Sequence, residues 1–327
     1  MPTLELRRKG NGHHRTQVGR RASRIVSLVA LMVLLGACNG QGAVPLPQPQ
    51  AGEVVVRMFG AFTYGGVWRG MEPVVQLEDQ LGRRLDVVHW FTNWDNAYYP
   101  AMVDAVTVGG RVPLISWQPT DLPVTAIAAG DHDDYVRSWA RGVADAPGLV
   151  YIRPFPEMNG EWVSWNGDPA SFRRAWRRVA GIFTAEGASN VRWVFGPNVT
   201  DEPRSEANRM EHYYPGHDVV DVLALSGYNW GETRPHIGWR TFEQIFDRAY
   251  ARLTAIGPQN VWLAEVASSE VGGDKAAWIQ DMLDSTAFPR LEAIVWFNEN
   301  KETDWRLESS PDSLAAFRSW FASNGRH

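Results

Sequence analysis

Eight short apolar runs, separated by amphipathic segments, are the feature that most constrains the fold of this chain. The runs are rich in Val, Ile, Leu and aromatic residues and lack strict alternation of apolar and polar positions. That pattern is typical of strands buried on both faces of a parallel sheet. The runs span residues 53–59, 85–91, 111–117, 148–155, 190–196, 221–228, 261–267 and 291–297. Eight such strands predict a closed barrel.

Helical patterns occupy several of the segments between these runs. Residues 169–187 follow Asp168, a favourable N-cap residue, and begin with Pro169. Residues 241–257 place apolar side chains on one face. The alternation predicts the fold class α/β, with a single (β/α)8 TIM barrel. An open doubly wound sheet is the alternative, but no G-x-G-x-x-G motif follows the first run.

The N-terminal residues differ in composition from the rest. Seven Lys and Arg and one Glu precede residue 25, and an apolar stretch then leads to Cys38. This predicts a signal peptide over residues 1–37, because the stretch is too short for a comfortable membrane span. Leu35-Gly36-Ala37-Cys38 resembles the bacterial lipoprotein box, so we expect lipidation of Cys38. A plain secreted protein is the alternative.

Residues 38–52 contain Cys38 and an uncharged stretch rich in Pro, Gly and Gln, which predicts a flexible tether. Residues 53–327 would then form the folded domain. Cys38 is the only Cys in the chain, so it has no intrachain disulfide partner. We expect an exported monomer, lipid-anchored on the outer side of the cell membrane or secreted. Arg20-Arg21 matches a twin-arginine export signal only loosely.

Charge and motif content disfavour several functional classes. Without its first 24 residues the chain has 25 Lys and Arg against 36 Asp and Glu, a net charge of −11. An acidic body argues against nucleic acid as a partner. No H-E-x-x-H motif or paired-Cys spacing occurs, so we expect no catalytic metal and no cofactor. Ser226 and Ser268 lack a G-x-S-x-G context, which disfavours a serine hydrolase.

Carboxylates and aromatic residues gather where the predicted strands end. The active site of a (β/α)8 barrel lies at the carboxyl ends of its strands. Glu157 follows the fourth run and Glu265 lies in the seventh, and these strands lie roughly across a barrel from each other. Two carboxylates and a set of aromatic rings are the groups needed to bind sugars and break a glycosidic bond. The predicted substrate-binding residues are Trp94, Trp117, Arg153, Asn159, Trp162, Trp165, Tyr228 and Trp296.

Four segments of the chain carry a resemblance to a known family. IRPFPEMNGEWVSW, YYPGHDVVDVLALSGYNW, VWLAEVAS and IVWFNENKETDWRL resemble successive segments of glycoside hydrolase family 26. The family comprises retaining β-glycanases on a (β/α)8 barrel that act mainly on β-mannans, with other members acting on mixed-linkage β-glucan or β-1,3-xylan. The resemblance implies Glu157 as general acid/base, Glu265 as nucleophile and Tyr228 as the residue that orients Glu265. Trp162 and Trp296 would shape the sugar site.

The residue environments agree with these implied roles. Aromatic neighbours should raise the pKa of Glu157 by desolvating its charged form, and Glu265 nearby should add to that shift. Glu265 must stay ionised, which requires hydrogen-bond donors such as Tyr228 or Arg153. A retaining mechanism predicts a separation of about 5–5.5 Å between the two carboxyls.

Some alternatives remain open from the sequence. The family usually has a His in the position of Pro156, and that His contacts substrate in mannan-cleaving members. Mixed-linkage β-glucan and β-mannan are therefore both candidate substrates. A non-catalytic carbohydrate-binding lipoprotein on the same barrel is the competing function. Glu157 could instead pair with Arg153 structurally, and Glu270 or Glu299 could take the place of Glu265.

Overall fold

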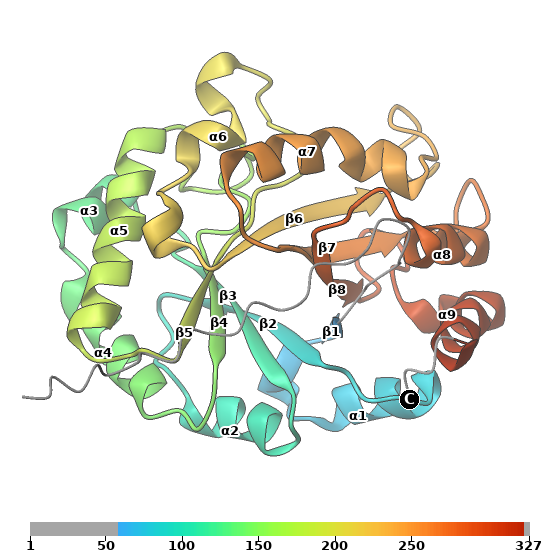
Figure 1. Cartoon of the computed structure of the whole chain (residues 1–327), viewed down its shortest axis with the longest axis horizontal. Helices are drawn as coiled ribbons and strands as arrows, with labels where there is room; N and C mark the ends of the chain where they lie inside the picture. The colour runs from blue at the N-terminus through green and yellow to red at the C-terminus, as the bar shows by residue number, and fades with distance from the viewer. Residues whose placement is uncertain (1–57, 324–327) are drawn as a thin grey trace, which may run out of the picture. The chain divides into compact units, whose positions relative to one another are not determined.

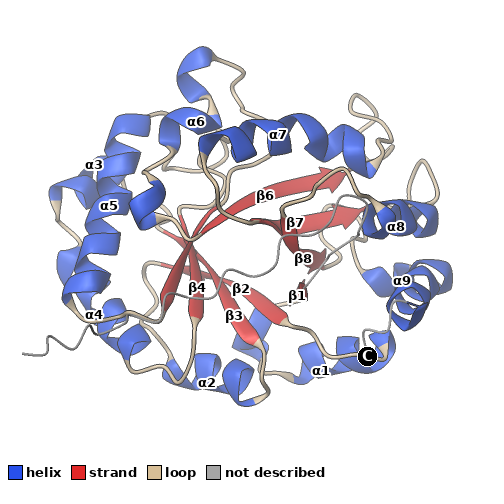
Figure 2. Ribbon diagram, in the orientation of Figure 1, coloured by secondary structure: helices blue, strands red, loops and turns tan. Residues whose placement is uncertain are grey.

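The eight strands pair in sequence order, and β1 closes the ring against β8 to give a parallel barrel. The computed structural model describes residues 58–323. Helices surround the strands in an outer ring (Figures 1 and 2), so the predicted (β/α)8 barrel is confirmed. The strands are β1 (Met58–Thr63), β2 (Val87–Asn93), β3 (Val112–Gln118), β4 (Val150–Pro154), β5 (Val191–Phe195), β6 (Val222–Asn229), β7 (Val261–Ser268) and β8 (Leu291–Asn298).

Two of the longer helices begin at side-chain caps that the sequence offers. The Asp168 side chain accepts a hydrogen bond from the backbone N–H of Ser171, and Thr241 and Gln244 form a capping box. The α-helices are α1 (Glu72–Leu81), α2 (Pro100–Val108), α3 (Val124–Ala129), α4 (Asp133–Ala144), α5 (Pro169–Ala185), α6 (Met210–Tyr213), α7 (Phe242–Ile256), α8 (Lys275–Asp284) and α9 (Pro311–Ser323). Short 3-10 helices are η1 (Gly66–Arg69), η2 (Glu206–Asn208), η3 (His217–Val219) and η4 (Leu307–Ser309).

Side chains alternate between the barrel interior and the helix layer along each strand. One apolar cluster fills the interior, and a larger one packs the strands against the helices. The interior cluster contains Val87, Leu114, Val194, Val222, Ala224, Trp262, Ala264, Ala293 and Val295. A residue near the end of a strand can therefore face the mouth of the barrel only if this alternation points its side chain inward.

A break in register in the middle of β7 shifts this alternation by one residue. Leu225 pairs with Leu263, but the next residue of β6, Ser226, pairs with Glu265, so Ala264 is the extra residue of a bulge. Ala264 belongs to the interior cluster, and strict alternation would turn Glu265 outward to the helices. The bulge lets Glu265 face the mouth of the barrel instead.

The predictions for residues 1–52 lie outside the described residues, as does most of the first predicted strand. Within residues 58–323, no helix is long and apolar enough to cross a membrane.

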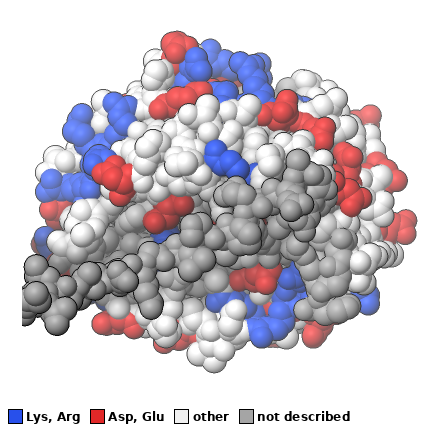
Figure 3. Space-filling view, viewed as in Figure 1, with Lys and Arg blue, Asp and Glu red and all other residues white. Residues whose placement is uncertain are grey.

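On the face drawn in Figure 3, Lys and Arg side chains gather over the region where Figure 1 labels α6 and α7, with some Asp and Glu among them.

Candidate active site

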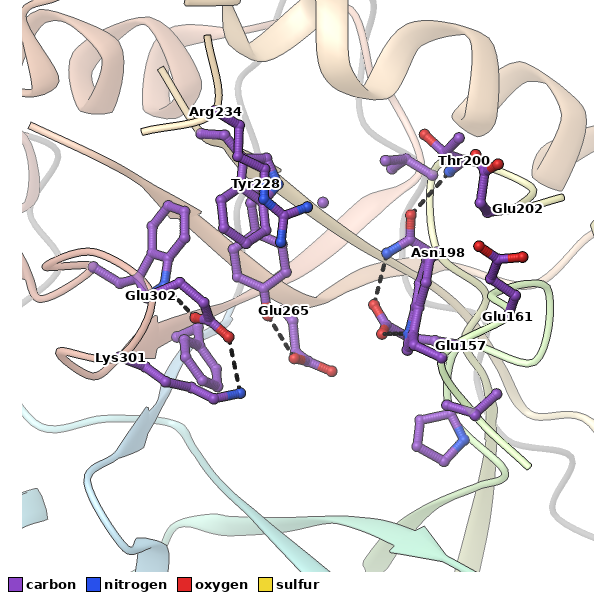
Figure 4. Close-up of a pocket in the computed structure, with 18 of the residues that line it drawn as sticks. Glu157, Glu161, Asn198, Thr200, Glu202, Tyr228, Arg234, Glu265, Lys301 and Glu302 are labelled. Carbon is purple, nitrogen blue, oxygen red and sulfur yellow. Dashed lines mark hydrogen bonds and ion pairs between the residues drawn. The ribbon is translucent and has the colours of Figure 1, made fainter. Parts of the chain in front are cut away.

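A cleft of about 1360 Å³ opens at the carboxyl ends of the strands. Glu157 and Glu265 lie on opposite sides of it in the close-up of Figure 4, with Tyr228 beside Glu265 and Asn198 beside Glu157. Every strand, or the loop that follows it, contributes at least one lining residue: Phe62, Phe91, Gln118, Glu157, Asn198, Tyr228, Glu265 and Phe297. The cleft is thus a product of the whole barrel.

Glu157 is positioned by a turn of unusual backbone conformation after β4. Phe155 and Glu157 have φ values of 52° and 55°, a left-handed region that non-glycine residues rarely adopt. The turn is held by the Glu157 N–H, which donates to the Gly196 carbonyl at 3.0 Å, and by the Phe155 N–H, which donates to the Trp117 carbonyl at 3.1 Å. Such conformations cost about 1–3 kcal/mol each and cluster at functional sites.

The carboxylate of Glu157 accepts two side-chain hydrogen bonds. Trp162 Nε1 donates to Oε2 at 2.8 Å, and Asn198 Nδ2 donates to Oε1 at 2.7 Å. Burial raises the pKa of Glu157, and the negative charge of Glu265 raises it further. Arg153, Asn198 and Trp162 oppose the shift without cancelling it. Glu157 is therefore suited to hold a proton and donate it to a leaving group.

Glu265 has a contrasting set of neighbours. Arg153 Nη1 donates to its Oε1 in a buried ion pair, and the Tyr228 hydroxyl donates to its Oε2 at 2.6 Å. Burial alone would raise the pKa of Glu265, but the Arg153 charge and these hydrogen bonds outweigh it, so the pKa lies below the ordinary value. Glu265 is thus suited to remain an anion.

Arg153 is completely buried beneath the cleft. Its Nη2 donates to the Gly196 carbonyl at 2.9 Å and to Ser226 Oγ at 2.7 Å. A Cβ atom at Gly196 would lie 2.3 Å from Arg153 Nε, so only glycine leaves room for the guanidinium there. The guanidinium is thereby held against Glu265.

His89 lies in the same buried layer. Its Nε2 makes a 2.8 Å hydrogen bond with Ser116 Oγ, and burial lowers its pKa to about 3, so it is neutral near pH 7. His89 is therefore a hydrogen-bonded residue of the barrel interior rather than a base. Within the described part of the chain, no group of three or more His, Cys, Asp or Glu is placed to hold a metal ion.

Replacing Arg153 with Met is expected to move the acid limb of the kcat/KM profile to higher pH. Arg153 favours the charged form of Glu265, so its loss raises the pKa of Glu265. Breaking a buried pair should also lower the free energy of unfolding by about 3–5 kcal/mol. A pH–rate profile and a denaturation curve measure the two effects.

Arg111→Met provides the matched control, because Arg111 forms a similarly buried ion pair with Glu78 away from the cleft. It should destabilise the fold but leave the pH profile unchanged. An acid limb that does not move in Arg153→Met contradicts the assigned role.

Replacing Trp162 with Phe is expected to move the basic limb to higher pH. Trp162 Nε1 stabilises the ionised form of Glu157, so its removal raises the pKa below which Glu157 can act as an acid. Stability should change little because Trp162 is 53% exposed. Trp68→Phe is the control: its Nε1 donates to a carbonyl, that of Phe91. A shift of equal size in both variants would contradict the interpretation.

Three predicted substrate-binding tryptophans do not line the cleft. Trp296 is fully buried and faces α8, with its ring 6.2 Å from that of Trp278. The prediction for Trp296 is wrong because the interior positions of β8 are odd-numbered, so Phe297 faces the cleft. Trp117 likewise points outward, and Trp94 stacks on it at 4.6 Å. Both belong to the core between strands and helices.

Two polar residues predicted to bind substrate are also buried beneath the cleft. Arg153 supports Glu265, as described above, and cannot reach a sugar. Asn159 is fully buried, and its amide donates to the Asn198 and Thr200 carbonyls and to Asp201. Asn159 thus anchors the loop after β5. Both predictions of substrate contact are therefore corrected to positioning roles.

The other predicted residues lie at the cleft. Tyr228 and Trp162 line it and touch the two carboxylates. Trp165 lines it but is only 3% exposed, and its Nε1 donates to the Pro156 carbonyl at 2.8 Å. Trp165 therefore supports the turn that carries Glu157.

Some residues of the site were not predicted from the sequence. Asn198 binds Glu157 from the loop after β5, where the Gly-Pro-Asn sequence after an apolar run was the available signal. Trp305 lines the cleft from the loop after β8, with its ring 5.2 Å from that of Tyr228. Nothing in the spacing of Trp305 distinguishes it from a core residue.

The sequence pattern of glycosyl hydrolase family 26 matches residues 129–284. The chain is 38% identical over 269 residues to Endoglucanase H of Acetivibrio thermocellus, a match that covers 77% of this chain and 30% of that protein. It is 33% identical over 90 residues to mannan endo-1,4-beta-mannosidase A and B of Caldalkalibacillus mannanilyticus, covering 24% and 16% of the two chains. The chain thus spans less than a third of the length of these relatives.

Solved structures share the fold at low sequence identity. A family 26 beta-mannanase from Bacteroides ovatus superposes with a TM-score of 0.62 at 18% identity, covering 81% of this chain and 88% of that one. An endo-beta-1,4-mannanase from Cellulomonas fimi gives a TM-score of 0.62 at 16% identity, covering 81% and 70%.

Proposed function

This chain belongs to glycosyl hydrolase family 26, and from that premise we propose that it hydrolyses a β-linked polysaccharide by double displacement. Glu157 acts as general acid and then general base, and Glu265 acts as nucleophile. One observation carries the proposal: two carboxyls line one cleft, and their surroundings shift their pKa values in opposite directions.

The first step forms a bond between Glu265 and the anomeric carbon. The glycosidic bond breaks as its oxygen takes the proton of Glu157, and the sugar stays covalently attached to Glu265. In the second step Glu157, now ionised, removes a proton from water, and the water oxygen displaces Glu265 from the anomeric carbon. Tyr228 and Arg153 hold Glu265 in place and stabilise its negative charge in the free enzyme and at the end of the cycle.

Mixed-linkage β-glucan is the substrate we favour over β-mannan. The match to a protein named as an endoglucanase extends over 77% of the chain, whereas the match to the mannosidase from Caldalkalibacillus extends over 24%. Pro156 stands where mannan-cleaving members have a substrate-binding His. The cleft volume of about 1360 Å³ exceeds the roughly 300–1,000 Å³ of a typical small-ligand pocket, which favours binding of several sugar units and internal cleavage.

A substrate panel tests this function. Mixed-linkage β-glucan, β-mannan and β-xylan are incubated with the wild-type protein and with Glu157→Ala, and the anomeric form of the first product is followed by proton NMR. We expect wild-type cleavage of mixed-linkage glucan with a β-anomer formed first. If the wild-type protein binds these polymers but cleaves none, the non-catalytic binding function replaces the proposal.

We also propose that the protein is exported and anchored to the outer side of the cell membrane through lipid on Cys38. This rests on the sequence of residues 1–38 alone. In cells that express the full chain, Cys38→Ser is expected to move the protein from the membrane fraction to the soluble exported fraction. Mass spectrometry of the mature N-terminus should show a lipidated Cys only in the wild type. An unmodified Cys38, or identical fractionation of both proteins, would count against the anchor.

A further inference from the structure

A second hollow adjoins the cleft and differs from it in charge. It has a volume of about 580 Å³ and lies between the loop after β5 and one face of α7. Val199, Thr200, Arg204, Arg240 and Ile245 line both the hollow and the cleft, so the two are contiguous. We call it the arginine hollow after the five arginines in its lining: Arg204, Arg209, Arg240, Arg248 and Arg252.

The charges of the two regions are opposite. Five arginines and two carboxylates, Asp201 and Glu206, line the arginine hollow. The cleft has seven Asp and Glu in its lining against four Arg and Lys. The chain as a whole carries a net charge of −5. The arginine hollow is therefore a site of positive charge beside an acidic cleft on an acidic protein. Its arginines are either balanced by nearby carboxylates or available to bind an anion.

Two of the five arginines are explained by ion pairs that build the wall of the hollow. Arg252 is bound to Glu211 and Asp201 with contacts of 2.6 and 2.8 Å, and its side chain is 18% exposed. Arg209 pairs with Glu206 and Glu211. These pairs hold this part of the lining in place and leave little of its positive charge unbalanced.

The other three arginines have weak carboxylate partners or none. The nearest carboxylate oxygen to Arg204 is that of Glu202 at 3.9 Å, and the Arg204 side chain is 81% exposed. Within residues 58–323, no carboxylate lies within 4.0 Å of the guanidinium of Arg240 or Arg248. The Arg240 guanidinium donates from Nη2 to the Gln244 carbonyl, which leaves its charge unpaired and its other N–H groups available. Three guanidinium groups around one hollow thus have no close carboxylate partner and can bind an anion from outside the protein.

The hollow is held in a fixed relation to the catalytic carboxyl. The Arg240 N–H donates to Asn229 Oδ1 at 3.1 Å, and Trp278 Nε1 donates to the Arg240 carbonyl at 2.9 Å. On the other side, the Thr200 N–H donates to Asn198 Oδ1 at 3.0 Å, and Asn198 in turn binds Glu157. Figure 4 shows Thr200 and Glu202 on the same side of the cleft as Glu157.

We propose that the arginine hollow binds an anionic substituent, a carboxylate or a sulfate or phosphate ester, of the β-glycan whose backbone lies in the cleft. Guanidinium groups bind such oxyanions through paired N–H donors, with geometry that a neutral sugar hydroxyl does not match. The inference rests on the proposed function, since it takes a glycan in the cleft as given. A free inorganic anion has the same chemistry, and the experiment below separates the two sources.

The test compares a neutral mixed-linkage β-glucan with the same glucan partly oxidised at C6 to the uronate. The quantity measured is the ratio of kcat/KM for the oxidised glucan to kcat/KM for the neutral one. An exposed ion pair contributes about 1.5- to 5-fold, so three arginines acting together should give a wild-type ratio of roughly three- to a hundredfold at low ionic strength. The ratio should fall towards one as salt rises.

The variant Arg204→Gln/Arg248→Gln should lower the ratio to about 1.5- to 5-fold, the contribution left to Arg240. Arg318→Gln is the matched control, because Arg318 is an exposed arginine on α9 outside both cavities, and it should keep the wild-type ratio. A wild-type ratio near one, or a double variant that keeps the wild-type ratio, overturns the proposal. A third outcome is a ratio near one together with binding of inorganic phosphate to the wild-type protein with a Kd below about 1 mM. That result would assign the hollow to a free anion instead.

A binding measurement separates this inference from the proposed function. Affinity electrophoresis of the Glu157→Gln protein in gels containing either glucan reports binding without turnover. One outcome is that the wild type hydrolyses neither glucan, while the oxidised glucan retards the protein more than the neutral one does only when Arg204 and Arg248 are present. In that case the enzyme proposal fails and the anion site stands. Equal retardation by both glucans overturns the anion site while leaving the enzyme proposal intact.

Discussion

Replacing Glu265 with Ala is expected to lower kcat on mixed-linkage β-glucan by roughly 10⁴- to 10⁶-fold, the range seen when a catalytic nucleophile is removed. Glu265 is the carboxylate that the structure keeps ionised, through Arg153 and the Tyr228 hydroxyl. Without it no covalent intermediate can form. Initial rates on the polymer measure the loss, and Glu265→Gln should show a loss of similar size because an amide is a poor nucleophile.

Chemical rescue distinguishes loss of the nucleophile from loss of the fold. The Ala variant leaves the Arg153 charge buried and unpaired, so its stability must be measured alongside its activity. Azide fits the space left by the carboxylate and attacks the anomeric carbon directly. With an activated aryl β-glycoside, we expect an α-glycosyl azide, the product of a single inversion.

Two further carboxylates serve as controls for that assignment. Glu299 lines the cleft, and burial raises its pKa, while Glu270 accepts hydrogen bonds from Ser309 and Ser313 outside the cleft. Their Ala variants should keep activity within about tenfold of the wild type. A loss of 10⁴-fold in Glu299→Ala, with azide rescue there and not in Glu265→Ala, would transfer the nucleophile role.

The barrel could be predicted from the sequence because it depends on local patterns repeated eight times. Each strand is an apolar run of five to eight residues, and the helices at 169–185 and 242–256 carry their caps in the sequence. Errors in single boundaries, such as residue 148 against the observed start of β4 at Val150, do not alter the order of elements. Topology then follows because parallel strands need crossover helices.

The site could be predicted only as far as strand position determines side-chain direction. Glu157 and Glu265 both reach the cleft, but neither does so by regular alternation. Glu157 depends on two left-handed residues, and Glu265 depends on a bulge at Ala264. Neither feature has a recognisable signal in a single sequence, since no glycine marks the turn or the bulge.

The aromatic residues show the limit of prediction from strand ends most clearly. Trp117, Trp296 and Tyr228 all lie near the carboxyl end of a predicted strand, yet only Tyr228 faces the cleft. One step in register along a strand separates a sugar-contacting position from a core position. Because large aromatic residues occupy both inward and outward positions near these strand ends, residue type alone does not indicate which of them face the cleft.

Replacing Glu157 with Ala is expected to lower kcat on mixed-linkage β-glucan by about 10²- to 10⁴-fold, the contribution typical of a general acid and base. The polymer has a poor leaving group, so its glycosidic oxygen needs the proton that the raised pKa keeps on Glu157. A dinitrophenyl β-glycoside has a good leaving group and needs no proton. Its first step should therefore stay fast in Glu157→Ala, and the release of dinitrophenol should show a burst followed by slow turnover.

The slow phase of that experiment tests the second role of Glu157. Water needs a general base to attack the glycosyl-enzyme, but azide does not, so azide should accelerate turnover and give a β-glycosyl azide through two inversions. Glu161→Ala removes an exposed carboxylate four residues away in the same cleft and should show neither burst nor azide product. An α-azide from Glu157→Ala would mean that Glu157 is the nucleophile. A β-azide from Glu157→Ala and an α-azide from Glu265→Ala require that the two carboxyls act on opposite faces of one sugar ring. Two carboxyls on opposite sides of a single cleft provide that arrangement.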